Sequence, residues 1–69
     1  MIDKEKIKDV QLLEVGIDLW EKYYENENPY GVTCHFSKGE RQGIDNMTKL
    51  EAIKKAKEIL TLMEKEIEG

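Results

Sequence analysis

The adjacent residues Cys34 and His35 are the first candidates for chemistry, because a thiol and an imidazole can act together as nucleophile and general base. They lie in the segment 30–36, where apolar residues occupy every second position. This pattern predicts a strand, in which adjacent residues point to opposite faces of a sheet. We therefore expect Cys34 to be a buried structural thiol, and His35, the only histidine, to be a polar residue on the other face.

Paired carboxylates and metal ligands give no stronger signal. Glu21/Glu25 and Glu64/Glu68 lack the apolar surroundings that acid–base catalysis by two carboxyl groups needs. The glycines do not have the strand–glycine–helix spacing of a phosphate-binding loop. One cysteine and one histidine build neither an internal disulfide nor a zinc site. The sequence therefore predicts a chain that is not an enzyme and uses no metal or cofactor.

The length of 69 residues predicts one small domain, 1–69, near the size where a single core is only just sufficient. We therefore expect a homodimer or docking on a larger partner as added stabilisation. No apolar run approaches the roughly 20 residues that cross a bilayer, and the charged N-terminus does not resemble a signal peptide. A lone thiol fits a reducing compartment, so we expect a cytoplasmic protein. Ten lysines against one arginine favour a bacterial or phage origin.

A helix is predicted from Thr48 to about Ile67. Thr48 and Glu51 have the spacing of a capping box, which marks the start of a helix. At 100° per residue, apolar side chains then form one stripe along this helix. The stripe consists of Ala52, Ile53, Ala56, Ile59, Leu60, Met63 and Ile67.

Three strands are predicted to supply the apolar surface that this helix needs. They run from about Leu12 to Tyr24, from Tyr30 to Phe36 and from Glu40 to Ile44. A helix over the first segment would place Glu14 and Glu21 inside its apolar stripe, so period-two alternation fits better. A short helical turn, with Asp3 as a candidate N-cap, is predicted in residues 3–11. The predicted fold is α+β, a three-stranded antiparallel β-meander packed on one face by the long C-terminal helix (βββα).

The turn at residues 37–39 decides which side chains of the second and third strands reach the core. Ser37-Lys38-Gly39 predicts a three-residue hairpin loop with Gly39 at positive φ. This loop sets Val32 opposite Ile44 and Cys34 opposite Gln42. The expected sheet core is Leu13, Val15, Ile17, Leu19, Val32, Cys34, Phe36 and Ile44. The opposite face would carry Leu12, Trp20 and Tyr24 among Asp18, Thr33 and His35, while Leu50 and Leu62 fall outside the helix stripe.

The net charge of −4 resides in residues 1–29, which hold eight acidic and four basic side chains. An acidic balance favours a protein partner over a nucleic-acid phosphate backbone, although it also serves solubility. Aromatic residues rimmed by carboxylates suit a partner with a basic surface, as in a small inhibitory or regulatory protein. The expected partner-binding residues are Asp18, Trp20, Glu21, Tyr24, Glu25 and Glu27. In the alternative arrangement, Trp20 folds back over the sheet edge or packs on the N-terminal segment.

Two other functions remain open. The chain could be a structural dimeric subunit, or a nucleic-acid-binding regulator that uses cations of the hairpin and the helix. The cations expected for the second function are Lys38, Arg41, Lys49, Lys54, Lys55 and Lys57.

The segment from Val32 to Ile59 resembles the arm-binding domains of phage and transposon integrases, through the hairpin glycine Gly39 and the helix start Thr48-x-x-Glu51-Ala52. It also resembles double-stranded-RNA-binding domains, through the lysines that begin its helix. Both resemblances imply a sheet followed by a helix. The strands depart from both families because they carry Glu14, Asp18, Glu21 and Glu40, so the resemblance is used for the fold and not for the function.

Overall fold

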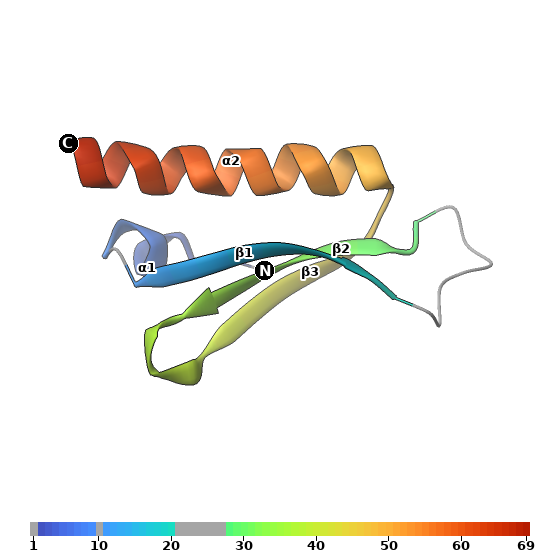
Figure 1. The fold of residues 1–69 in the computed structure, drawn as a ribbon, viewed down its shortest axis with the longest axis horizontal. Helices are drawn as coiled ribbons and strands as arrows, with labels where there is room; N and C mark the ends of the chain where they lie inside the picture. The colour runs from blue at the N-terminus through green and yellow to red at the C-terminus, as the bar shows by residue number, and fades with distance from the viewer. Residues whose placement is uncertain (1, 10, 21–27) are drawn as a thin grey trace.

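The structure is a computed structural model that describes residues 2–9, 11–20 and 28–69. Its elements are a short helix α1 (Lys4–Lys8), strands β1 (Leu12–Leu19), β2 (Tyr30–Phe36) and β3 (Arg41–Met47), and a long helix α2 (Lys49–Glu68). The strands form one antiparallel sheet in the order β1-β2-β3. Figure 1 shows α2 lying across one face of this sheet. The predicted α+β fold (βββα) is therefore confirmed.

The core lies between the central strand β2 and α2. Val32, Cys34 and Phe36 alternate along β2 toward the helix, and each is at most 2 % exposed. Ala52 and Ile59 of α2 pack against them. Burial of one large apolar side chain stabilises a fold by about 1.5–3 kcal/mol. Burial of these side chains is therefore the main interaction that holds the helix on the sheet.

The start of α2 is the predicted capping box. The Thr48 hydroxyl accepts a hydrogen bond from the Glu51 N–H at 3.2 Å, and the Glu51 carboxylate accepts one from the Thr48 N–H at 3.0 Å. The hydrogen bond from the Thr48 backbone lowers the pKa of Glu51 below its ordinary value of 4.5. Two donors that a helix start leaves unpaired are thereby satisfied.

The hairpin between β2 and β3 also follows the prediction. Val32 lies opposite Ile44 and Cys34 opposite Gln42. The turn spans residues 37–39, in which Gly39 has φ 77° as predicted and Lys38 also has a positive φ, 68°.

β3 runs further than the sequence predicts. It continues to Met47, whereas the third strand was predicted to end at Ile44 and residues 45–46 to form a turn. Asn46 has φ 63°, and the pairing with β2 shifts between Ile44 and Met47. The strand thus passes these residues as a bulge, because asparagine tolerates the left-handed conformation better than most residues.

A β-bulge at Leu13 overturns two predicted burial states. Leu12 pairs with Phe36 and Glu14 pairs with His35, so Leu13 is the extra residue. Leu12 is buried in the core and Leu13 is 72 % exposed, the reverse of the prediction. An inserted residue shifts the alternation by one, which moves every side chain before it to the other face.

The remainder of β1 keeps the predicted phase, since Val15 lies opposite Cys34 and Ile17 opposite Val32. Ile17 and Leu19 face the helix side but are 46 % and 49 % exposed, so they are less buried than predicted. β1 ends at Leu19, one residue before Trp20. The rest of the predicted strand, residues 21–24, lies outside the described residues.

The apolar stripe of α2 is also rotated from its predicted position. Leu60 and Ile67, which were predicted to be buried, are exposed. Leu62, which was predicted to lie outside the stripe, packs against the core. Leu62 and the buried Ile7 of α1 line the same hollow, so α1 packs on the Leu62 side of α2.

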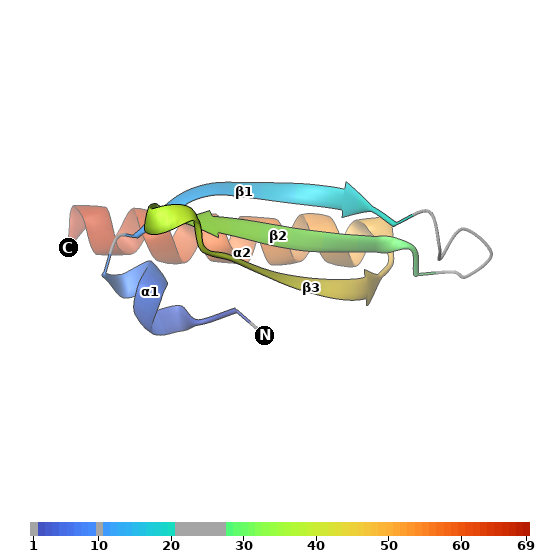
Figure 2. The same ribbon diagram turned by 90° about the horizontal axis from the view of Figure 1, so that it is seen from below.

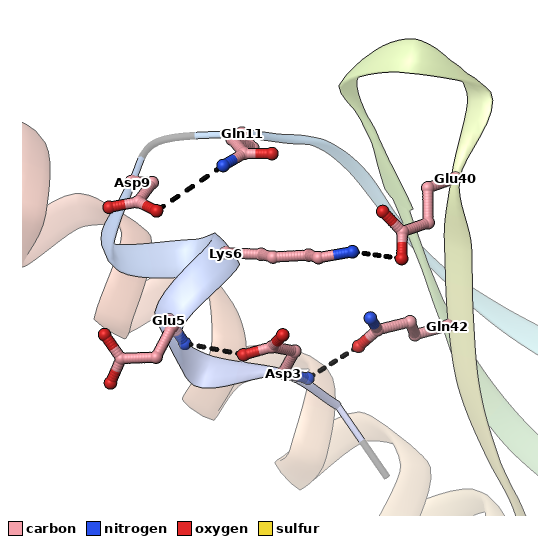
Figure 3. A network of polar contacts seen from close by, with 7 residues as sticks. All are labelled: Asp3, Glu5, Lys6, Asp9, Gln11, Glu40 and Gln42. Carbon is pink, nitrogen blue, oxygen red and sulfur yellow. Dashed lines mark hydrogen bonds and ion pairs between the residues drawn. The ribbon is translucent and has the colours of Figure 1, made fainter.

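The N-terminal segment and α1 lie on the β3 side of the molecule (Figure 2). Asp3 is the N-cap of α1, which confirms the predicted helical turn, and its own N–H donates to Gln42 Oε1 at 2.6 Å. Lys6 forms an ion pair with Glu40, and its Nζ lies 5.8 Å from the centre of the Phe36 ring. Figure 3 shows how these contacts join α1 to the start of β3.

Truncation of the central core residue tests this packing. Phe36→Ala removes a side chain that is 2 % exposed, and we expect it to lower the free energy of unfolding by about 3–5 kcal/mol. Urea denaturation followed by circular dichroism measures the change. Leu50→Ala is the control, because Leu50 is 60 % exposed and its loss should change stability by no more than about 0.5 kcal/mol. Equal midpoints for the two variants would contradict the core described here.

The ion pair between α1 and β3 predicts a pH dependence. The hydrogen bond from Lys6 lowers the pKa of Glu40 below its ordinary value of 4.5. A carboxyl group with a lowered folded pKa stabilises the fold above its unfolded pKa, and this stabilisation disappears as the pH falls through the folded pKa. We expect Lys6→Met to raise the pKa of Glu40, as measured by NMR titration. The variant should be less stable than the native chain at neutral pH, and the difference should shrink in acid. A Glu40 titration that Lys6→Met leaves unchanged would exclude the ion pair.

Candidate functional site on the helix-free face of the sheet

The face of the sheet turned away from α2 has a depression in its middle. Gly16 of β1 and Gly43 of β3 lie on either side of Thr33 of β2. A shallow depression of about 430 Å³ lies here, with Trp20 at one end. We call this surface the open face and define it by Asp18, Trp20, Thr33, His35, Arg41 and Gly43.

Trp20 is the largest side chain on the open face. The backbone N–H of Trp20 donates to the Pro29 carbonyl at 2.8 Å, which holds this residue beside the start of β2. A Cβ built on Gly31 would lie 2.8 Å from the indole Nε1 and 2.6 Å from the Ile44 carbonyl oxygen. Glycine at position 31 therefore makes room for the indole against the sheet. Trp20 lies over the sheet and also lines a hollow with Asp45 of β3, so it is not folded over the outer edge of β1.

An acidic residue lines each of the two hollows that Trp20 borders. Asp18 lines the depression beside Trp20 and accepts a hydrogen bond from the Thr33 hydroxyl. Asp45 lines the neighbouring hollow. A carboxylate has about four acceptor positions, so the bond to Thr33 leaves Asp18 able to bind a further donor. The Trp20 end of the open face thus combines an aromatic ring with negative charge.

The opposite end of the open face has mixed charge. His35 lies between Glu14 of β1 and Arg41 of β3 in the strand register. His35 is half-buried, whereas Glu14 and Arg41 are exposed. Interspersed charges of both signs give no strong net field at this end.

Cys34 and His35 cannot act as a nucleophile–base pair. Cys34 is fully buried beneath α2, while His35 lies on the open face. Burial raises the pKa of the Cys34 thiol above its ordinary value of 9.0, which disfavours the nucleophilic thiolate. The structure therefore gives Cys34 the buried structural position predicted for it.

The structure brings together only part of the predicted partner-binding set. Asp18 and Trp20 lie side by side at one end of the open face. Leu12, which was also predicted on this face, lies in the core because of the bulge at Leu13. The other predicted residues, Glu21, Tyr24, Glu25 and Glu27, lie outside the described residues.

The cations of the alternative nucleic-acid function are spread over the molecule. Lys38 and Arg41 lie at the β2–β3 hairpin, at the opposite end of the sheet from Lys49 at the start of α2 (Figure 1). Lys54 and Lys57 are exposed along α2. Lys55 forms an ion pair of 3.1 Å with Glu58. These six residues do not form one continuous basic surface.

Sequence reasoning missed the glycines that shape the open face. The sequence pattern gave Gly16, Gly31 and Gly43 no role on this face. The sequence did contain a signal, because the alternation of the strand places Gly31 on the same face as Thr33 and His35. Glycine inside a strand often marks a close approach to the backbone, which here comes from Trp20.

Comparison with known proteins found no matching family model, no similar curated protein and no similar solved structure. Within the described residues, no three histidine, cysteine, aspartate or glutamate side chains gather as metal ligands. In the same part of the chain, no helix has both the length and the apolar character to span a bilayer. The geometry of the open face is therefore the main indication of function.

Substitution at the glycine beneath Trp20 tests this geometry. Gly31→Ala introduces a Cβ that would meet the Ile44 backbone, so we expect a loss of about 1–3 kcal/mol in stability. We also expect the fluorescence of Trp20, the only tryptophan, to shift to longer wavelength as water reaches the indole. Gly16→Ala is the matched control, since nothing lies within 4 Å of its Cβ position. If Gly31→Ala behaves like Gly16→Ala, Trp20 does not lie over residue 31.

Proposed function

We propose that this chain is a small protein-interaction module, of a regulatory or inhibitory kind, that binds a partner protein through the open face. The observation that supports this most is the position of Trp20 on glycine backbone, on the face that α2 leaves uncovered. Trp20 is 39 % exposed. Tryptophan is enriched at the energetic centres of protein interfaces because it buries a large area with few rotatable bonds.

The charges beside Trp20 support a partner that presents lysine or arginine. A cation over the indole would gain a cation–π interaction, and Asp18 and Asp45 line the two hollows that Trp20 borders. The sequence that follows, residues 21–27, adds three glutamates and one lysine. Electrostatic complementarity of this kind contributes mainly to specificity and to the rate of association.

A protein partner is favoured over a nucleic acid by the distribution of cations. Binding to a phosphate backbone needs several lysines or arginines on one surface. Here the hairpin cations and the helix lysines lie apart, and Lys55 is paired with Glu58. A binding role is also favoured over a catalytic one, because the single thiol is buried and separated from the single histidine.

Affinity capture with matched variants tests the proposal. The native chain, Trp20→Ala and Leu50→Ala are each immobilised, and proteins retained from a lysate are quantified by mass spectrometry. We expect at least one protein to be retained by the native chain and by Leu50→Ala and to lose affinity for Trp20→Ala by about 30-fold, the loss typical of a binding hot spot. Asp18→Lys should also weaken its binding, because the charge next to the indole is reversed.

Two results would contradict this function. In the first, Trp20→Ala folds, as judged by circular dichroism, and still retains the same proteins as the native chain. In the second, the native chain binds duplex DNA or RNA with an affinity that falls steeply with salt, which is the signature of a nucleic-acid-binding protein.

A further inference from the structure

The two edges of the sheet differ in what lies beside them. Along β3, the Asp3 N–H donates to the Gln42 side chain and Lys6 pairs with Glu40, so the N-terminal segment and α1 occupy the start of that edge. The bulge at Asn46 interrupts the other end of β3. Among the described elements, none lies outside β1 (Figure 2). Edge strands in native proteins are usually protected against pairing with another chain. Among the described elements, none gives the β1 edge this protection.

The strand register shows which backbone groups lie on the outer edge of β1. The Trp20 N–H donates to Pro29, and the groups of an antiparallel strand alternate between its two sides. Gly16 and Asp18, in phase with Trp20, therefore direct their N–H and C=O groups to β2. Val15, Ile17 and Leu19 direct theirs outward, where a further strand would pair with them.

The side chains of these same residues form an apolar strip. Val15, Ile17 and Leu19 face the helix side of the sheet, and Ile17 and Leu19 are 46 % and 49 % exposed. Leu60 of α2 is also exposed. At 100° per residue it points away from Leu62, which faces α1, and so lies on the β1 side of the helix. Outward-facing backbone groups, which have no partner strand among the described residues, and exposed apolar side chains thus coincide along β1.

We propose that two copies of this chain form a homodimer by antiparallel pairing of β1 with β1 about a twofold axis at Ile17. In this register Ile17 lies opposite Ile17 of the second copy, and Val15 lies opposite Leu19. On the open face, Gly16 lies opposite Asp18. The three outward-facing residues of each copy exchange backbone hydrogen bonds, and their apolar side chains meet beneath the two helices.

Charge selects this register over its neighbour. With the axis at Gly16, Glu14 would lie directly opposite Asp18 of the second copy, twice in the dimer. Like charges directly opposite each other on paired strands are destabilising. The axis at Ile17 removes both pairs of like charges and leaves only apolar pairs on the helix side.

The dimer would join two three-stranded sheets into one continuous sheet. Both α2 helices lie on the same side of it, where they flank Ile17 and Leu19. Both open faces lie together on the other side. Because the pairing uses the edge and the helix side, this inference does not depend on the proposed function of the open face.

Sedimentation equilibrium tests the pairing. The seam is smaller than the interface of an obligate dimer, so we expect reversible dimers with a dissociation constant on the order of 10 µM. Ile17→Asp places like charges at the twofold axis and should weaken dimerisation by about 100-fold. Ile67→Asp makes the same change on an exposed residue in the last turn of α2, away from the proposed seam, and it should dimerise like the native chain. A native chain that stays monomeric at about 1 mM would overturn the inference.

A cysteine substitution tests the register directly. Residues paired across antiparallel strands have Cα atoms about 5.5 Å apart, within the range of a disulfide. Ile17→Cys should therefore form covalent dimers under mild oxidation, while Cys34 stays buried and unreactive. Leu13→Cys is the control, because Leu13 is more exposed but lies away from the axis. Equal cross-linking of the two variants, or dimers of Ile17→Asp that are as stable as those of the native chain, would refute the proposed pairing.

Discussion

Burial of Val32, Cys34 and Phe36 beneath α2 holds the sheet and the long helix together. These side chains belong to the central strand, so their contacts with the helix hold both neighbouring strands in place. The chain has 69 residues and neither a disulfide nor a cluster of metal ligands in its described part. At this size, the net stability is a small difference between the large favourable free energy of apolar burial and the large conformational entropy that the chain loses on folding. Loss of one central contact therefore affects the whole fold.

Coverage of one face leaves the other face with a different composition. A single long helix can bury one side of a three-stranded sheet, and the open side must then be compatible with water. Glycine, threonine and charged residues meet this requirement along most of the open face. Trp20 is the exception, and Gly31 accommodates it by having no side chain. The proposed binding function follows from this exception.

The position of α1 accounts for the difference between the β1 edge and the β3 edge of the sheet. α1 is only five residues long, yet it buries Ile7, contacts β3 and packs on the Leu62 side of α2. The β1 edge has no comparable element among the described residues. A second copy would supply the missing strand with the same apolar residues that the first copy exposes, which is the self-complementarity that a twofold interface requires.

Features with local signals could be predicted from the amino-acid sequence. The alternation in residues 30–36, the hairpin with Gly39 and the capping box of Thr48 and Glu51 each depend on φ, ψ or hydrogen bonds within a few residues, and the structure confirms all three. From these features the α+β fold and the positions of Cys34 and His35 followed.

Tertiary structure alone decided the exchange of Leu12 and Leu13, the rotation of the buried stripe of α2 and the placement of Trp20 over Gly31. Leu12 enters the core because it packs in one cluster with Phe36 and Ile7, and no local rule distinguishes it from Leu13. Leu62 replaces Leu60 in the core because α1 packs on that side. Each of these outcomes depends on contacts between segments that are distant in the sequence. Such contacts form only when the sheet and the helices pack together, so a local sequence pattern does not reveal which side chain they bury.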